Sequence, residues 1–288
     1  MRQITLRIKY TFKALINEST TPMGKWKTSL KYRINKLYSK IVPFSYQADK
    51  YRHTFLASAE LDAGQAAPHP PAERKIYAFW TGHNPMSNNR RRGITSLQAV
   101  AGVPVVLVTP ENLPQFIQPN APLHPAFEYL SLVHKSDYLR CYFMHHLGGG
   151  YSDIKPCRHN WLASFEQLEA SPAYAIGYPE RKQDGLAQVD GVIQQDMNQY
   201  YSQIIGNCAH ICRPDTPFTR AWYRELHCRM DFYADELKLH PGNTMGDNEG
   251  YPIPWTHILG DIFHPLNLKY MDKILKDSRL QPVCTDYR

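Results

Sequence analysis

The sequence contains no apolar run approaching the ~20 residues that a helix needs to cross a bilayer. Its N-terminus also lacks the uninterrupted apolar core and the cleavage site of a secretory signal peptide. Six cysteines in 288 residues do not indicate a disulfide scaffold, and they fit a reducing compartment. These absences predict a cytoplasmic protein without a membrane span or a disulfide framework.

Acidic residues are almost absent from the first 40 positions, where Glu18 stands against ten lysines and arginines. The whole chain has a formal net charge of +7 and an isoelectric point near 9.0. This excess of positive charge predicts an anionic partner, which can be membrane lipid, a nucleotide or nucleic acid.

Residues 30–41 combine this positive charge with helical periodicity. Leu30, Ile34, Leu37 and Ile41 recur on one side, with basic residues elsewhere, a pattern typical of a helix at a membrane surface. We therefore expect residues 1–56 to form a basic amphipathic extension that contacts an anionic membrane peripherally, on its cytoplasmic face. A solvated tail, or a helix packed on the rest of the chain, explains the pattern equally well.

Residues 57–74 are rich in alanine and proline and show no apolar periodicity, so they are predicted to be a linker.

The remaining residues, 75–288, suit a single α/β domain. KIYAFW at 75–80 and VPVVLV at 103–108 fit buried strands with a helix between them, which is the βαβ start of a parallel sheet. Further strands are expected at 173–178 and 202–212, and a helix is expected to open at Thr216 and Pro217.

The most informative stretch is KSDYLRCYFMHHLGGGYSDIKP at residues 135–156. Ser136 or Asp137 is suited to cap a helix, and apolar residues then recur at steps of four from Leu139 to Leu147, the spacing of one buried helical face. A short helix at 127–134 is expected to precede it.

Three glycines follow this predicted helix. Gly148 is expected to end it, since glycine adopts the positive φ of a helix C-cap, and three glycines in succession let the backbone approach a ligand. Residues 151–154 then fit a short strand whose end presents Asp153 and Lys155. Open α/β sheets bind their ligands at such carboxyl ends of strands.

At these residues the sequence resembles a known family. The arrangement S-D-x-x-R, an apolar helix, G-G-x-Y and an acidic motif is similar to the glycosyltransferases with a DxD sugar-binding region, which include Och1-like mannosyltransferases and bacterial capsular polysaccharide synthesis proteins. The resemblance spans residues 75–270 and is strong only between 135 and 153. It implies a GT-A fold and a UDP- or GDP-sugar donor. It also implies retaining transfer of a hexose-type sugar to a glycan or lipid-linked glycan of a bacterial surface polysaccharide.

The resemblance also assigns roles to residues. Asp137 and Arg140 match the S-D-x-x-R positions that contact the nucleotide and organise the donor pocket, although a surface i,i+3 ion pair has the same spacing. Tyr151 matches the aromatic residue of G-G-x-Y, and Asp153 matches the first acid of the motif. The donor-binding set is completed by Gly149, Gly150, Trp80 and Thr81, of which the last two end the first strand, where relatives stack the donor base.

The acidic motif departs from the family at one position. Relatives carry Asp-x-Asp, whose carboxylates hold the donor ribose and a divalent ion, whereas this chain has Asp153, Ile154 and Lys155. A protonated lysine cannot bind Mg²⁺ or Mn²⁺, which take oxygen ligands, but it can neutralise the leaving diphosphate. Three alternatives are open: Lys155 replaces the ion, Asp153 holds the ion with distant ligands, or the site is degenerate.

A late segment, residues 240–265, carries several side chains able to act on a donor. Relatives often complete the donor pocket with a late loop that bears a carboxylate or histidine. By position, Asp247 and His257 are predicted to contact phosphate, to bind an ion or to activate the acceptor. An inverting enzyme would need a general base, for which Asp247 and Glu249 are the candidates. Glu249 and His264 join Asp247 and Asp153 as candidate metal ligands.

Two other groups have simpler explanations. Arg90, Arg91 and Arg92 could reach a diphosphate, but a solvated basic face accounts for them as well. Cys208, His210 and Cys212 have a spacing compatible with zinc, yet they lie in a predicted buried strand and a fourth ligand is not evident.

Two other classes of function remain as alternatives. A catalytically silent GT-A domain that binds a glycan or a partner protein would explain why Lys155 replaces the second acid of the motif. A basic nucleic-acid-binding module would explain the N-terminal arm but not the acidic motif, so no nucleic-acid partner is expected. A dinucleotide-binding dehydrogenase is excluded, because the glycines precede a strand end instead of opening a helix.

Overall fold

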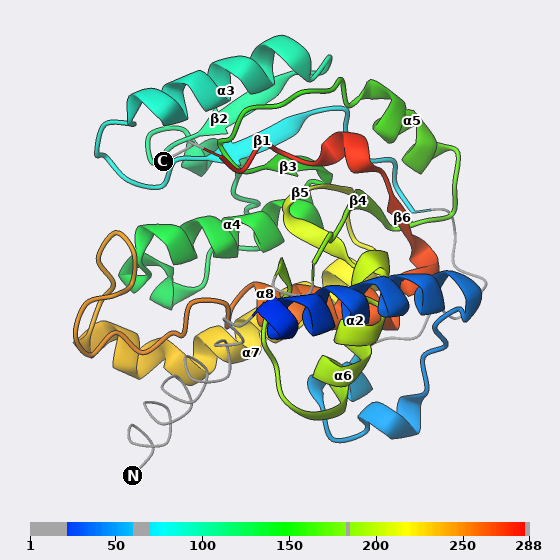
Figure 1. Cartoon of the computed structure of the whole chain (residues 1–288). Coiled ribbons are helices and arrows are strands. Elements are labelled where there is room, and N and C mark those ends of the chain that lie inside the picture. The colour runs from blue at the N-terminus through cyan, green and yellow to red at the C-terminus, as the bar shows by residue number, and fades with distance from the viewer. Residues whose placement is uncertain (1–21, 60–68, 183–184, 286–288) are drawn as a thin grey trace.

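The computed structural model describes residues 22–59, 69–182 and 185–285; for residues 22–28 it describes the backbone alone. Within these ranges, six strands form one mixed sheet in the order β2-β1-β3-β5-β4-β6 (Figure 1). The strands are β1 (Ile76–Phe79), β2 (Val105–Val108), β3 (Gly149–Ser152), β4 (Ala175–Pro179), β5 (Ile205–Cys212) and β6 (Ile274–Lys276). All pairings are parallel except those made by β5, which runs antiparallel to β3 and β4.

Helices cover both faces of this sheet. The α-helices are α2 (Pro22–Ile41), α3 (Asn88–Val100), α4 (Leu132–His146), α5 (Leu162–Glu169), α6 (Gly191–Gln199), α7 (Pro217–Leu239) and α8 (Gly260–Lys269). The 3-10 helices are η1 (Ala48–Tyr51), η2 (Phe55–Ser58), η3 (Leu113–Phe116), η4 (Pro125–Tyr129), η6 (Tyr201–Gln203), η7 (Met271–Lys273) and η8 (Ser278–Leu280). In Figure 1, α3 and α5 lie on one face of the sheet, and α4, α7 and α8 lie on the other. This layered arrangement confirms the predicted α/β fold class.

The alternation of side chains along β1 separates the two layers of the core. Ile76 and Ala78 join the cluster of buried residues under α3 and α5, whereas Tyr77 and Phe79 join the cluster around α4. Successive side chains of a strand point to opposite faces, so four consecutive buried residues indicate a strand covered on both sides. β1 is therefore an interior strand, covered on both faces and paired with β2 on one side and β3 on the other.

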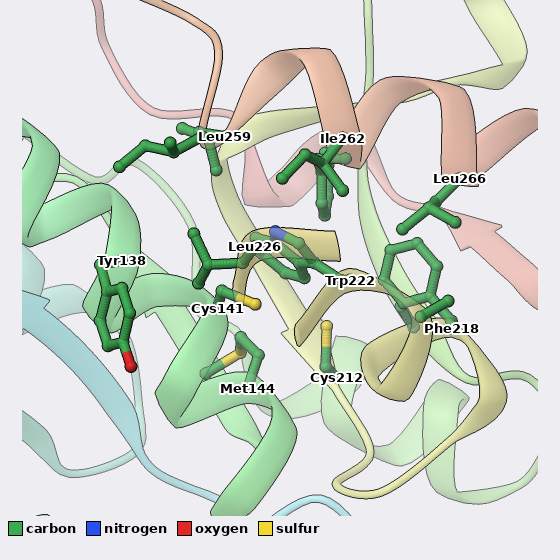
Figure 2. Packing of buried hydrophobic residues seen from close by; sticks show 14 of the residues in the cluster. Tyr138, Cys141, Met144, Cys212, Phe218, Trp222, Leu226, Leu259, Ile262 and Leu266 are labelled. Atoms are coloured by element: carbon green, nitrogen blue, oxygen red, sulfur yellow. The ribbon is translucent and has the colours of Figure 1, made fainter. Parts of the chain in front are cut away.

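Helix α4 is enclosed by the rest of the protein, and all of its residues from Asp137 to Met144 are buried. Figure 2 shows Cys141 and Met144 of α4, Cys212 of β5 and Trp222 of α7 in the same packed layer. A helix surrounded in this way carries buried residues on every side, so the apolar spacing of four in the sequence describes only one of its faces. Charged residues on α4 are consequently drawn into the interior.

The sequence predicted most elements of the domain correctly. The predicted βαβ start is confirmed as β1, α3 and β2, with β1 and β2 parallel. The strands expected at 173–178 and 202–212 correspond to β4 and β5, although η6 takes part of the second range. Thr216 caps α7 through a capping box with Thr219, as the Thr216-Pro217 pair predicted.

Two predicted boundaries around α4 are wrong. The helix begins at Leu132 and is capped by Ser131, whose side chain accepts a hydrogen bond from the backbone N–H of His134 at 3.2 Å. Ser136 and Asp137 therefore lie in its second turn. The helix predicted at 127–134 is divided between η4, which ends at Tyr129, and α4, which begins at Leu132. The prediction for Gly148 is confirmed, because its φ is +66° and its N–H donates to the carbonyl of Phe143 at 2.9 Å.

The described part of the N-terminal extension packs against the α/β domain. Tyr51 and Leu56 are fully buried in the same cluster as α4 and α7. Within the predicted linker, Ala59 and Ala72 are buried, and residues 60–68 lie outside the described residues. Of the helices described, none has the length and apolar character needed to cross a membrane.

Candidate functional site

A cavity of about 660 Å³ opens at the carboxyl ends of β1 and β3. Its walls are formed by the ends of these two strands, the start of β5, the first half of α4 and residues 244–245, 255–256 and 259–260. Because β5 is antiparallel to β3, it presents its beginning, and not its end, at this edge of the sheet. Residues far apart in sequence therefore meet in one cavity.

Four charged side chains form the floor of this cavity: Asp137, Arg140, Asp153 and Lys155. The Nη2 atom of Arg140 lies 3.4 Å from Oδ1 of Asp137 and 3.2 Å from Oδ1 of Asp153. The Nζ atom of Lys155 lies 2.8 Å from the other carboxylate oxygen of Asp153. With all four groups ionised, two positive charges balance two negative charges. We call these residues the charged cluster.

Tyr151 completes the hydrogen bonding of the charged cluster. Its hydroxyl donates to Oδ1 of Asp153 at 2.6 Å and accepts from Nη2 of Arg140 at 2.7 Å. The guanidinium of Arg140 also lies 4.1 Å from the centre of the Tyr151 ring, and its Nη1 donates to the carbonyl of Asn207 at 2.8 Å. These contacts fix Arg140 in one orientation between α4, β3 and β5.

The ionisation of Asp153 is set by its two cationic neighbours. Burial alone would raise the pKa of Asp153, but Lys155 and Arg140, with hydrogen bonds from Lys155 and Tyr151, hold it well below its ordinary value. Burial would lower the pKa of Lys155, but Asp153 raises it above the ordinary value. Asp153 and Lys155 are therefore both charged at neutral pH.

The pKa of Asp137 shifts in the opposite direction, upward. Burial raises the pKa of Asp137 to about 7; Arg140 opposes the rise and the negative charge of Asp153 adds to it. This carboxyl group therefore changes protonation near neutral pH, and it can donate or accept a hydrogen bond there. Such a perturbed group in a cavity is typical of a functional site.

A divalent ion does not fit the position of the family's Asp-x-Asp motif in this chain. Both oxygens of Asp153 are already hydrogen bonded, one to Tyr151 and Arg140 and the other to Lys155. Lys155 is buried, and its ammonium group lies beside the carboxylate that would ligate an ion, so it would repel that ion. Over the described ranges, no group of three or more His, Cys, Asp or Glu residues is placed to hold a metal ion.

Trp80 and Thr81 lie at the end of β1, at the boundary between this cavity and a second one of about 890 Å³. The indole N–H of Trp80 donates to the carbonyl of Asn84 at 2.8 Å, and the hydroxyl of Thr81 donates to the carbonyl of Leu132 at 2.6 Å. The second cavity continues over residues 108–123, which are largely apolar. Trp80 thus offers an aromatic face between the charged cluster and a mainly apolar compartment.

Residues 243–245, which we call the roof of the first cavity, are hydrogen bonded to the start of α4 through the main chain. The backbone N–H groups of Leu132 and Val133 donate to the carbonyls of Asn243 and Thr244, each at 3.2 Å. The first N–H groups of a helix have no partner within the helix, so these bonds satisfy them. Thr244 and Met245 are thereby held beside the cavity, and Trp255 lies half exposed at its edge.

Three residues of the cavity were missed or weakly indicated by the sequence. Arg90 faces the cavity, and its Nη1 donates to the carbonyl of Ile154 at 2.9 Å; Arg91 and Arg92 instead contact asparagines of their own helix. Asn207 and Cys208 enter from the start of β5. No local motif marks them, because their position depends on the antiparallel direction of β5.

Gly149 and Gly150 do not line the cavity, although they were predicted to bind the donor. A Cβ atom on Gly149 would lie 3.0 Å from the carbonyl oxygen of Lys75, and one on Gly150 would lie 3.0 Å from a side-chain atom of Ile76. These glycines allow β3 to pack closely against the start of β1. Glycine is therefore required at both positions by close packing within the sheet, and not by contact with a ligand.

The four residues predicted from the late segment lie away from the charged cluster and do not line its cavity. Asp247 is exposed and accepts from the side chain of Asn243 at 2.7 Å, and Glu249 is exposed. His257 contacts the hydroxyl of Tyr233 on α7 at 2.9 Å. His264 is buried and accepts from the backbone N–H of Ala187 at 2.9 Å, so it supports the fold. Their catalytic or metal-binding roles stay predictions.

Comparisons with known proteins add little to these observations. No family model matches the chain, and no curated protein matches it. Among solved structures, the chain is similar to one described as "PaToxG Glycosyltransferase", with a TM-score of 0.41 and 14% sequence identity. That similarity covers 83% of this chain and 78% of the other.

Proposed function

We propose that this protein is a glycosyltransferase that moves a sugar from a nucleoside-diphosphate sugar to a hydroxyl group of a glycan without a divalent ion. The observation that carries the proposal is the position of Lys155. Lys155 lines the cavity and is 5% exposed, and its ammonium group lies 2.8 Å from Asp153, where the related motif has a metal-binding acid. A fixed cation at this place supplies the charge that the ion supplies elsewhere.

The cavity offers a complementary group for each part of such a donor. Lys155, Arg140 and Arg90 provide positive charge for the diphosphate. Asp137 offers a carboxyl group for a sugar or ribose hydroxyl. Trp80 provides an aromatic surface on which a nucleobase can stack, a contact worth about 1–3 kcal/mol for a base on an aromatic ring.

The proposed reaction needs no further reagent. The acceptor hydroxyl oxygen forms a bond to the anomeric carbon of the sugar, while the bond from that carbon to the diphosphate oxygen breaks. The electron pair of the broken bond leaves on the diphosphate, where Lys155 and Arg140 stabilise the added charge. The hydroxyl proton passes to the departing diphosphate on the same face, so the configuration is retained and no separate base is used.

The acceptor and biological setting rest on the sequence resemblance alone. We propose a glycan or lipid-linked glycan of a bacterial surface polysaccharide, and a UDP- or GDP-sugar as donor. The open side of the cavity, beside the half-exposed Trp255, is where such an acceptor would enter.

A catalytically silent donor- or glycan-binding domain is the second candidate. It is favoured by the closed hydrogen bonding of Asp153, whose two oxygens already have partners within the charged cluster. In that case Lys155 would only neutralise a buried acid.

The test is release of nucleoside diphosphate from a panel of UDP- and GDP-sugars by the full chain, in EDTA and with Mn²⁺. We expect release from one donor in EDTA that Mn²⁺ does not increase. Strict dependence on Mn²⁺ would contradict an ion-free site. Donor binding without release, in both conditions and with glycan acceptors present, would favour the silent domain. Absence of donor binding would refute the transferase and leave only a silent domain that binds a glycan.

Lys155 is tested by three variants. Lys155→Met should lower the rate of release by roughly a hundredfold, the effect of losing one group that stabilises developing negative charge. Lys155→Arg keeps the charge and should retain more activity than Lys155→Met. The matched control is Lys238→Ala, since Lys238 pairs with Asp235 on the exposed side of α7 and should leave release unchanged.

A further inference from the structure

Helix α2 exposes the apolar side predicted from the sequence. Leu30, Ile34, Leu37 and Ile41 are 41%, 56%, 60% and 70% exposed. They recur every three to four residues and therefore form one stripe along the helix. Amphipathic helices of globular proteins normally bury such a stripe, so this stripe needs a partner outside the described part of the chain.

The polar side of α2 faces the rest of the protein. Ser39 is buried and lies 3.0 Å from the hydroxyl of Ser202, and the amide of Asn35 donates to the carbonyl of Asn198 at 3.0 Å. The carbonyl of Tyr32 accepts from the hydroxyl of Tyr201 at 3.2 Å. These contacts come from α6 and η6, and Figure 1 shows α2 beside α6. The helix is therefore held with its apolar stripe turned outward.

Positive charge borders the stripe. Lys31, Arg33, Lys36 and Lys40 are exposed, and the sequence of α2 contains no acidic residue. From their spacing, Arg33 and Lys40 flank one side of the stripe and Lys31 the other. An apolar stripe with cationic flanks is complementary to a bilayer surface with acyl chains beneath anionic headgroups.

We propose that α2 docks the protein on membranes that contain anionic lipids. The stripe enters the boundary between headgroups and acyl chains, while the flanking lysines and Arg33 contact lipid phosphates. The charge pattern favours this partner over a second copy of the chain, because two such surfaces placed together would bring like charges into contact. The inference stands independently of the transfer reaction proposed above.

The test is co-sedimentation of the full chain with vesicles of phosphatidylcholine alone or with phosphatidylserine. We expect binding that requires phosphatidylserine and weakens in high salt. Ile34→Asp combined with Leu37→Asp should weaken binding about tenfold or more, through lost apolar burial and added negative charge. The control is Phe232→Asp with Leu239→Asp, because these α7 side chains are 67% and 75% exposed but lie on another helix, and it should bind as the unaltered chain does.

Folding and self-association are separated in the same experiment. The α2 substitutions are at exposed positions, so the thermal unfolding of both double variants should match that of the unaltered chain. Equal vesicle binding by the α2 variant and the unaltered chain would overturn the proposal. So would a dimer in sedimentation velocity that the α2 variant abolishes, together with no preference for anionic vesicles.

Discussion

The Nζ atom of Lys155 lies 2.8 Å from Oδ2 of Asp153, and the two residues belong to the turn that directly follows β3. A short turn at the end of an interior strand holds both groups with little freedom. Each keeps the other charged in a place where either charge alone would be unfavourable. The pair is therefore important for the stability of the protein as well as for the proposed reaction.

Asp153→Asn tests this double role. The substitution keeps the shape of the side chain but leaves Lys155 buried without its carboxylate, so the free energy of unfolding should fall by about 3 kcal/mol. Release of nucleoside diphosphate should be lost. Urea unfolding followed by circular dichroism measures the first effect. Asp235→Asn, at a side chain 98% exposed on α7, is the control and should change neither quantity; turnover near normal in Asp153→Asn would refute the site.

Asp137→Asn should change how stability depends on pH. The pKa of Asp137 is about 7 in the folded protein and about 3.9 in an unfolded chain, so the folded state binds the extra proton between these values. This contribution to stability is complete below about pH 4 and is lost as the pH rises through 7. The variant should therefore gain stability relative to the unaltered chain between pH 5 and 8 while losing donor turnover. Parallel curves of unfolding free energy against pH would contradict the assignment.

His264→Gln should reduce the acid sensitivity of the protein. Burial lowers the pKa of His264 to about 3, against about 6.5 in an unfolded chain, so the unfolded state takes up the proton first. The neutral histidine stabilises the fold above about pH 6.5, and this stability is lost as the pH falls toward 3. Glutamine can still accept from the N–H of Ala187 but does not titrate. Its unfolding free energy should decline less between pH 6.5 and 4.5; His83→Gln, at an 80% exposed side chain, serves as control.

Gly148→Ala and Gly191→Ala separate backbone strain from steric conflict. Both glycines have positive φ, +66° and +69°, so alanine should cost roughly 1–2 kcal/mol of stability at each. At Gly148 the new Cβ would also lie 2.5 Å from Cδ of Pro214, whereas at Gly191 no atom lies within 4 Å. The loss should therefore be larger at Gly148 by about 1–3 kcal/mol. Equal losses of unfolding free energy in the two variants would show that the loop at Pro214 moves away from the new Cβ atom at no cost.

Local patterns in the sequence predicted the elements whose signals are local. β1 and β2 are continuous apolar runs, Thr216 with Pro217 marks the start of α7, and Gly148 marks the end of α4. The start of α4 was misplaced because Ser131 and Ser136 are both good capping residues, and only the tie to residues 243–244 decides between them.

The charged cluster was predicted as a set of residues but not as a network. S-D-x-x-R and G-G-x-Y placed Asp137, Arg140, Tyr151 and Asp153 together, and the cavity contains all four. Arg90, Asn207 and Cys208 also line the cavity, but their presence there depends on the order of strands in the sheet, which no short motif encodes. His257 turns toward α7, a direction that spacing along the chain could not indicate.

The main-chain bonds from Leu132 and Val133 to Asn243 and Thr244 have a consequence for how such a protein can diverge. Because they use only backbone atoms, substitutions at Thr244, Met245 or Trp255 leave them in place. In the proposed transferase, changes at these three positions would alter contacts with the sugar or the acceptor and leave the charged floor between α4 and β3 as it is. Substrate selectivity would then change separately from the charge that stabilises the diphosphate.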